Sequence, residues 1–193
     1  MNIVELLKKK EKDIVIYKHL RKGSVLFHEG DTCEYIGIVC EGEISIISYI
    51  NEGKEITYNT LRKDEIFGNN LIFSSEPYYK GDVIAEGKTL IGLIGKDDLI
   101  AILQNNSDFL KEYLKIQSDS SKALNNRIRL LSIQSAQDRF LFYMHEHKNR
   151  ITYDSIEHLA RKMYLSREAL TRLLSRLQKN NSIIRENKVI ILR

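Results

Sequence analysis

The chain has 193 residues and a formal net charge of +4, and it is 42% hydrophobic and 29% charged. Such a chain can bury a substantial core and is expected to form two modest domains. No apolar run approaches the roughly 18 residues of a membrane span, and residues 1–12 lack the apolar stretch of a signal peptide. We therefore expect neither a membrane-spanning nor a secreted protein, but a cytoplasmic one with its two thiols, Cys33 and Cys40, reduced.

Charge is divided unevenly along the chain. Residues 1–120 hold 15 Lys and Arg against 20 Asp and Glu, whereas residues 121–193 hold 15 against 6. A basic region of this kind is the electrostatic signature of a protein that binds a polyanion. The C-terminal region is therefore the candidate for nucleic-acid binding, and the N-terminal region is not.

Turn residues divide the first half of the chain into short segments. All ten glycines lie between Gly23 and Gly95. Short, evenly spaced strands between such turns are typical of a small barrel or jelly roll. An amphipathic helix over residues 1–12 is expected to precede them, and one of the turns is expected at Asn51-Glu52-Gly53. The strand candidates are residues 24–27, 35–39, 43–47, 54–61, 82–85 and 89–94.

A long helix is predicted over residues 107–132. Seven positions in it recur at alternating spacings of four and three, which is the heptad spacing of a coiled-coil seam. Gln117 and Ser121 are its polar positions, which can set the register or line a ligand pocket. We expect a parallel homodimer along the seam; the alternative is a helix that packs on its own domain through a wider stripe. The seam positions are Leu110, Leu114, Gln117, Ser121, Leu124, Ile128 and Leu131.

The residues that follow predict a helix-turn-helix. Apolar side chains recur at helical spacing over residues 156–163 and again over residues 170–177. Thr152 and Ser166 are expected to cap the two helices, because a hydroxyl oxygen accepts from the free N–H groups of a first helical turn. About three residues then remain between the helices, the length of a helix-turn-helix connection.

Two short β-branched runs end the chain. Residues 182–185 and 189–192 flank Glu186-Asn187-Lys188, which predicts a hairpin although the turn lacks the preferred Asn-Gly pair. Asn180-Asn181 is expected to end the preceding helix, since Asn tolerates the left-handed conformation of helix C-termini. A helix-turn-helix followed by a hairpin is a winged helix.

The polar face of the second helix holds the candidate DNA contacts. Arg167, Glu168 and Arg172 are expected to read bases in the major groove, because an arginine fork suits guanine and a carboxylate accepts from cytosine N4. The alternative is an ordinary helical hairpin with a solvated charged face. The expected contacts to the DNA backbone are Ser166, Thr171, Arg176 and Lys179.

Five short segments lie in order along the chain and carry a family resemblance. Residues 22–31 read KGSVLFHEGD and residues 39–44 read VCEGEI; Gly53-Lys54-Glu55 and Phe67-Gly68 follow, and Ser166-Arg167-Glu168 with Arg172 comes last. These motifs are similar to K-G-x-x-x-F-x-E-G-D, V-x-x-G-x-I and S-R-E-x-x-x-R of one family. The chain resembles the cyclic-AMP receptor protein/Fnr (Crp/Fnr) family of bacterial transcription regulators over about 170 residues.

The resemblance implies an α+β protein in three parts. A cyclic-nucleotide-binding-like β-roll, or double-stranded jelly-roll barrel, spans residues 1–106; a dimerisation helix spans 107–132; and a C-terminal winged helix-turn-helix spans 133–193. It implies a homodimeric, sequence-specific regulator with a sensor barrel, which binds an inverted-repeat site on double-stranded DNA and contacts RNA polymerase if it is an activator. A regulatory adaptor that acts through protein contacts is the alternative.

Departures from the family concern the effector. Cyclic-AMP-binding members follow Phe-Gly with a Glu that holds the ribose, and Asn69 stands there. Their Arg-Ser or Arg-Thr pair for the phosphate falls at Tyr79-Lys80, and their Thr-Ser pair for adenine at Leu124-Asn125. We expect no response to cyclic AMP or cyclic GMP, and a different small-molecule effector or none. The candidate effector pocket consists of Asn69, Tyr79, Lys80, Gln117, Ser121, Leu124 and Asn125.

Other motifs carry less chemistry. The family's glycine between the two helices is Tyr164, so we expect a slightly different turn there. Two cysteines fall short of the four thiolates of an iron–sulfur cluster, which favours structural thiols over a redox or thiol-ligand role. His145-x-His147 places its imidazoles on different helix faces, so no metal or other cofactor is expected. Catalysis has no candidate residues, and we expect no enzyme.

Overall fold

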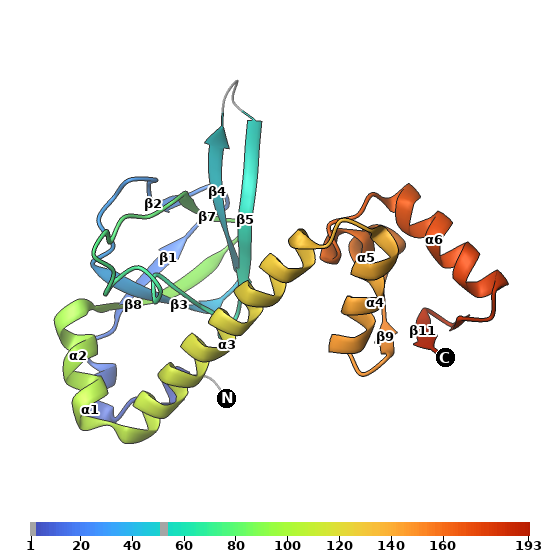
Figure 1. The fold of residues 1–193 in the computed structure, drawn as a ribbon. Helices are drawn as coiled ribbons and strands as arrows, with labels where there is room; N and C mark the ends of the chain where they lie inside the picture. Colours follow the sequence, from blue (N-terminus) through green and yellow to red (C-terminus); the bar gives the residue numbers. More distant parts are fainter. Residues whose placement is uncertain (1–2, 51–53) are drawn as a thin grey trace. The chain divides into compact units, whose positions relative to one another are not determined.

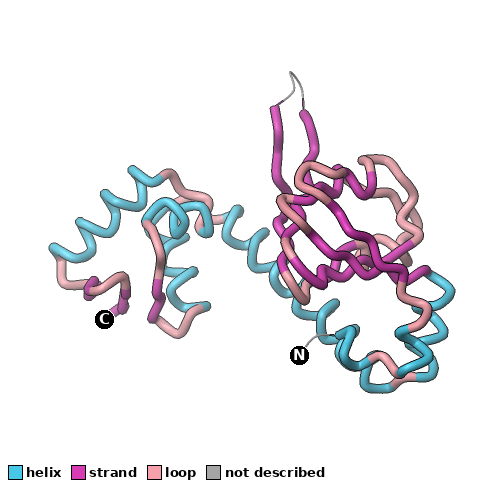
Figure 2. The backbone as a smooth tube through the Cα atoms, turned by 180° about the vertical axis from the view of Figure 1, so that it is seen from behind, coloured by secondary structure: helices cyan, strands magenta, loops and turns pink. Residues whose placement is uncertain are grey.

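The computed structural model describes residues 3–50 and 54–193, which form two compact units, Met1–Ser118 and Asp119–Arg193. The expected turn at Asn51-Glu52-Gly53, and with it Gly53 of the third motif, lies outside the described residues. Strands dominate the first unit and helices the second (Figure 2). Among the described residues, no helix has the length and apolar character needed to cross a lipid bilayer.

The first unit is a β-roll made of two antiparallel sheets, each with four strands within the described residues (Figure 1). One sheet has the strand order β1 (Ile16–Leu20), β8 (Thr89–Gly95), β3 (Tyr35–Glu41), β6 (Ile66–Phe67). The other has the order β2 (Val25–Phe27), β7 (Asp82–Ala85), β4 (Glu43–Ile50), β5 (Lys54–Arg62). Strands distant in sequence are neighbours in both sheets, as in a jelly roll. The roll is followed by the helices α2 (Lys96–Asn105) and α3 (Ser107–Ser132).

Side chains from both sheets share one apolar core. Ile38 and Ile91 enter it from one sheet, and Ile44 and Val83 enter it from the other; all four are fully buried. Burying each such side chain stabilises the fold by roughly 1.5–3 kcal/mol relative to leaving it exposed. The six strand candidates of the sequence are confirmed as β2, β3, β4, β5, β7 and β8.

Two strands of the roll are absent from the sequence-based prediction. β1 lies at the edge of its sheet, and four of its five residues are exposed. It therefore lacks the apolar–polar alternation that marks a half-buried strand. β6 has only two residues, which is too short for any periodic signal.

The N-terminal segment is broken, so the prediction of a single helix over residues 1–12 was wrong. A 3-10 helix, η1 (Ile3–Leu6), is followed by the short helix α1 (Lys9–Lys12). The Glu11 carboxylate accepts a hydrogen bond from the Lys8 N–H at 2.6 Å. Lys8 is therefore the N-cap of a new helix, and the contact corresponds to one half of a capping box.

One buried amide, that of Asn106, holds the turn between α2 and α3; the residue is 5% exposed. Its Oδ1 accepts from the Phe109 N–H at 3.1 Å and so caps the first turn of α3. Its Nδ2 donates to the Leu6 carbonyl at 2.9 Å and to the Glu11 carboxylate at 2.8 Å. Asn106 thus joins the N-terminal segment to the start of the long helix.

The second unit holds the C-terminal part of α3 and a winged helix. Its further elements are α4 (Ala136–Glu146), β9 (Arg150–Thr152), α5 (Ile156–Lys162), α6 (Arg167–Lys179), β10 (Ile183–Glu186) and β11 (Val189–Leu192). The strands form a sheet of order β10-β11-β9. Phe140 and Met144 of α4 are fully buried against the predicted leucine stripe of α6. The buried leucines of that stripe are Leu170, Leu173, Leu174 and Leu177.

The helix-turn-helix is confirmed, but Thr152 is not its first cap. Thr152 lies in β9, where it pairs with Val189 of β11. Ser155 caps α5 instead, because its Oγ accepts a hydrogen bond from the His158 N–H at 3.1 Å. The cap moves three residues along the chain because the short strand β9, which the sequence pattern did not reveal, takes up Thr152.

The predicted hairpin is confirmed as β10 and β11. Its turn residues Asn187 and Lys188 have φ of 46° and 61°, so both lie in the left-handed region that a two-residue type I′ turn requires. The turn therefore forms without the preferred glycine at its second position. The preceding helix α6 ends at Lys179, and Asn181 adopts a left-handed φ of 57°, as expected for that pair of asparagines.

Candidate functional site

The outward face of α6 carries the polar side chains predicted to contact DNA. Ser166 caps the helix as predicted, with its Oγ accepting from the Ala169 N–H at 3.1 Å. Burial of the four leucines fixes which side of the helix faces outward. The exposed residues of this face are Arg167, Glu168, Thr171, Arg172, Ser175, Arg176 and Lys179.

Four of these side chains have no polar partner among residues 3–50 and 54–193. In the described residues, Arg167, Glu168, Arg172 and Lys179 make no side-chain hydrogen bond and no ion pair. Three of them lie in the first two turns of α6, close to the helix N-terminus. These are the residues expected to read bases, and all of them are free to contact a ligand.

Besides the capping residue Ser166, two further expected backbone contacts are engaged inside the chain. Arg176 Nη2 donates to Gln137 Oε1 of α4 at 2.7 Å. The Thr171 hydroxyl donates to the Arg167 carbonyl at 2.8 Å, within the helix. A phosphate contact by Arg176 therefore requires that it share or give up its bond to Gln137, and the Thr171 hydroxyl still has lone pairs to accept a bond.

The long helix α3 has two apolar faces in different surroundings. Phe109 and Tyr113 are buried in the core of the first unit, so this face packs on the helix's own domain. The predicted seam lies elsewhere on α3. Four seam residues are more than half exposed, namely Leu114 (54%), Leu124 (57%), Ile128 (54%) and Leu131 (51%). Of the other seam positions, Ser121 is exposed, and Leu110 and Gln117 are partly buried.

Asn69 and Gln117, two expected effector residues, bind each other within the first unit. Asn69 Nδ2 donates to Gln117 Oε1 at 2.5 Å, and Gln117 Nε2 donates to the Asn69 carbonyl at 2.8 Å. The Tyr113 hydroxyl donates to the same carbonyl at 3.3 Å. Burial raises the pKa of Tyr113 to about 12, so this hydroxyl remains a donor at neutral pH. Gln117 is thus bonded both to the side chain and to the backbone of Asn69.

The remaining expected effector residues lie in dissimilar places. Tyr79 is 3% exposed, and its ring stacks on Phe27 with centroids 4.7 Å apart. Its hydroxyl donates to the Tyr35 carbonyl at 3.3 Å, and burial raises the pKa of the phenol. The structure therefore places Tyr79 in the core of the roll. Lys80, Ser121, Leu124 and Asn125 are exposed.

Sequence and structure comparisons find relatives for the whole chain. Residues 17–106 match the family described as cyclic nucleotide-binding domain. The Anaerobic regulatory protein of Bacillus subtilis (strain 168) is 26% identical over 189 residues, covering 90% of this chain and 79% of that protein. The Catabolite Activator Protein of Thermus thermophilus superposes with a TM-score of 0.57 at 18% identity, covering 100% of this chain and 94% of that one. A CooA mutant from Carboxydothermus hydrogenoformans gives 0.66 at 18% identity, covering 100% and 91%.

Regulators of the Crp/Fnr type are thus neighbours of this chain in sequence and in fold. Tyr164 takes the turn position at which the resemblance predicts a glycine. Its φ is 54°, so the backbone keeps the left-handed conformation instead of the altered turn expected from the sequence. That conformation costs an L-residue roughly 1–2 kcal/mol, which contacts around the turn have to offset.

The two thiols of the roll are covered to different degrees. Cys33 is 2% exposed, and its Sγ donates to the Tyr35 carbonyl at 3.4 Å and to the Gly68 carbonyl at 3.6 Å. Cys40 is partly buried. Burial raises the pKa of both thiols above that of a free cysteine, so both are protonated at neutral pH. This environment is that of packed thiols, since a reactive cysteine needs a lowered pKa and access.

A thiol reagent such as dithionitrobenzoate is expected to modify Cys40 slowly and Cys33 far more slowly in the native protein. The thiolate is the attacking species, and Cys33 is in addition almost fully covered. Single-thiol variants Cys33→Ser and Cys40→Ser allow the two rates to be measured separately at neutral pH, and both should become fast in denaturant. A native Cys33 that reacted as fast as the unfolded one would contradict the packed-thiol assignment.

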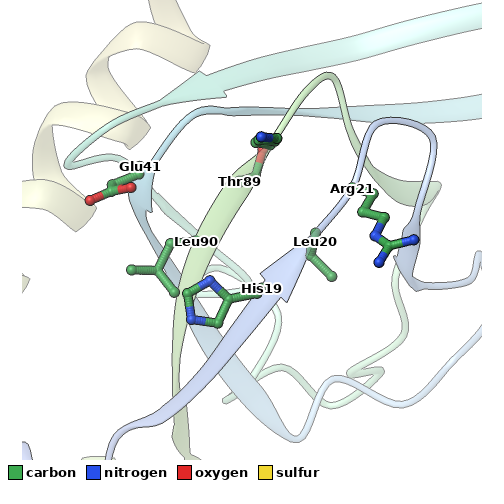
Figure 3. Close-up of a pocket in the computed structure, with 7 residues that line it drawn as sticks. His19, Leu20, Arg21, Glu41, Thr89 and Leu90 are labelled. Carbon is green, nitrogen blue, oxygen red and sulfur yellow. The ribbon is translucent and has the colours of Figure 1, made fainter.

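A surface pocket of about 450 Å³ lies elsewhere on the roll, at the end of β1 and the start of β8 (Figure 3). None of the expected effector residues lines it. Its Thr89 hydroxyl donates to the Glu43 carbonyl at 3.1 Å and is thus engaged in the fold. The lining residues are His19, Leu20, Arg21, Glu41, Lys88, Thr89 and Leu90. Sequence reasoning did not identify this pocket, because its residues share no motif and meet only where β8 pairs with β1 and with β3.

Proposed function

We propose that this protein is a homodimeric, sequence-specific DNA-binding transcription regulator with an N-terminal sensor domain, and not an enzyme. The exposed N-terminal end of α6 carries this proposal. Arg167, Glu168 and Arg172 are free there, on a capped helix, in a part of the chain with 15 basic against 6 acidic residues. Helices of this kind place their first turns against base edges. The proposal fits relatives that are described as regulatory and activator proteins.

Two copies of the chain are proposed to pair along the seam of α3. The supporting observation is that Leu114, Leu124, Ile128 and Leu131 are more than half exposed on one helix. Contiguous apolar stripes are uncommon on monomeric proteins, and a second copy would cover this one. A two-fold dimer presents two α6 helices to successive major grooves, so the proposed site is an inverted repeat with half-sites about 34 Å apart. An activator would in addition contact RNA polymerase in the cytoplasm.

Selection from a random double-stranded DNA pool tests the proposed function. The purified protein should enrich one inverted-repeat sequence, and its affinity should fall by roughly a thousandfold or more between ~50 and ~200 mM salt if each dimer neutralises six or more phosphates. A regulatory adaptor that acts through protein contacts would enrich no sequence. Absence of enrichment together with a flat salt dependence would overturn the proposal.

Cyclic AMP and cyclic GMP are expected not to bind. Asn69 is already paired with Gln117, and Tyr79 is in the core, so these positions have little to offer a ribose or a phosphate. The exposed Lys80 is the remaining cation of the expected pocket, and an ammonium cannot copy the planar fork of arginine. An unpaired phosphate in a partly closed barrel is costly.

Titration calorimetry with millimolar cyclic nucleotide measures this expectation directly. Heat should not exceed that of dilution, and DNA affinity should be unchanged by either nucleotide. Micromolar binding coupled to tighter DNA binding would show that the roll responds to cyclic nucleotides after all. A different effector, or none, remains part of the proposal.

A further inference from the structure

The side chain of Arg139, on α4, joins two segments of the second unit that are distant in sequence. Its Nε and Nη2 both donate to the Ile133 carbonyl, at 3.2 and 2.5 Å, in the link between α3 and α4. Its Nη1 donates to the Tyr164 carbonyl at 2.7 Å and to the Met163 carbonyl at 3.5 Å. Met163 and Tyr164 begin the turn between α5 and α6. One guanidinium therefore ties the end of the long helix to the helix-turn-helix turn.

A second arginine contacts the same turn from α3. The guanidinium carbon of Arg127 lies 5.3 Å from the centroid of the Tyr164 ring, which is within cation–π range. Tyr164 is thus contacted on its carbonyl by α4 and on its ring by α3. Because its left-handed backbone is unfavourable for a residue with a Cβ, these contacts account for how the turn is held in that conformation.

We propose that Arg139 is a positioning residue for base recognition, a role that rests on the proposed DNA-binding function. Tyr164 lies two residues before Ser166, the cap of α6, so its backbone sets the direction in which the first turn of α6 leaves the turn. Arg167 and Glu168 lie in that first turn. The fork of Arg139 reaches both carbonyls with fixed geometry, and its bonds are charge-assisted and therefore strong.

This role differs from simple stabilisation of the fold in what it affects. Residues that only stabilise the unit change its unfolding free energy and leave the preference among DNA sequences as it was. A residue that sets the direction of the first turn of α6 has a different effect. Its substitution changes the ratio of the affinity for the specific site to the affinity for non-specific DNA. Lys179 lies at the other end of α6, so its position depends less on the direction of the first turn. The phosphate contacts, and with them the salt dependence of binding, should therefore be unchanged.

The full-length variant Arg139→Lys is the test, because an ammonium keeps the charge but cannot bridge two carbonyls in one plane. The ratio of affinities for the selected site and for random DNA should fall by about tenfold, which corresponds to ~1.4 kcal/mol. Affinity for random DNA and its salt dependence should not change. Arg129→Lys is the matched control: it alters an arginine of the same unit that lies over the Phe142 ring and should leave the ratio unchanged.

The background variant Tyr164→Gly separates the turn from the rest of the fold. Glycine adopts a positive φ without strain, so the turn then needs less support and Arg139→Lys should lower the ratio less than about twofold there. If Arg139→Lys alone does not fold, recovery of folding and of the specificity ratio in the glycine background supports the role, and persistent unfolding overturns it.

Two failures can be told apart. A wild-type protein that does not distinguish its selected site from random DNA refutes the proposed function itself. A wild-type protein that discriminates, with an Arg139→Lys variant that folds and discriminates equally well, refutes only the positioning role. Equal weakening on all sequences would likewise refute it.

Discussion

A variant carrying both Leu124→Glu and Ile128→Glu is expected to sediment as a monomer and to bind its DNA site at least about a hundredfold more weakly than the wild-type protein. The reason is that linking two half-site contacts in a dimer raises avidity by roughly 10²–10⁴, and a monomer loses this gain. Both side chains are more than half exposed in the isolated chain. Charges there leave the fold of one copy undisturbed, since surface substitutions usually change stability by less than about 0.5 kcal/mol. In a paired seam, the same carboxylates are buried without partners, which strongly opposes association.

The control for this variant is Lys122→Gln with Ala123→Glu. These two exposed positions lie off the seam on the same helix, and the pair changes the net charge by the same amount. The control should remain dimeric, which shows that a change in charge alone does not separate the copies. Sedimentation equilibrium at micromolar concentration measures both. A wild-type protein that is itself monomeric under those conditions would rule out the seam as a dimer interface.

Substitutions on α6 are expected to separate base reading from phosphate binding. Arg172→Ala should weaken binding to the preferred site by ~1–3 kcal/mol and relax the preference at one base pair. Lys179→Ala should weaken binding to all sequences alike and lower the salt slope by about one. The reason is that Arg172 lies in the second turn of the helix, close to its N-terminal end, whereas Lys179 is its last residue.

Gln178→Ala serves as the control, because Gln178 is exposed on α6 but lies outside the predicted contact set. It should change neither affinity nor preference. The measurement is a competition assay with every single-base substitution of the selected site, repeated at several salt concentrations. Equal losses on every sequence for both Arg172→Ala and Lys179→Ala would show that the assignment of their roles is wrong.

Elements with a local pattern were predictable from the sequence. The leucines of α6 recur at helical spacing, and Ser166 stands where its hydroxyl can cap the helix, so position, type and buried face of α6 were all correct. Elements without such a pattern were not. β1 is exposed on both faces at a sheet edge, and β9 has three residues that exist as a strand only because β11 pairs with them. Missing β9 is also why the cap of α5 was placed at Thr152.

The same distinction holds for the candidate site. Exposure of Arg167 and Arg172 follows from their place opposite the leucines, which is a local property. The bonds of Arg139 to the carbonyl of Tyr164, and of Gln117 to that of Asn69, join residues 25 and 48 positions apart. Backbone carbonyls are present at every residue, so no residue type marks the acceptor in the sequence. Such contacts become visible only when the tertiary fold brings the segments together.

The bonds of Asn106 make the start of α3 depend on the first dozen residues of the chain. A protease that clipped the chain after Lys12 would remove both acceptors of the Asn106 amide, the Leu6 carbonyl and the Glu11 carboxylate. The amide would then exchange two bonds within the fold for bonds to water, which costs roughly 0.5–1.5 kcal/mol for each bond, and it belongs to the residue that caps α3. Terminal trimming, which many proteins tolerate, would here loosen the start of the helix proposed to pair the two copies. The first dozen residues therefore contribute to the stability of the helix on which the proposed dimer depends.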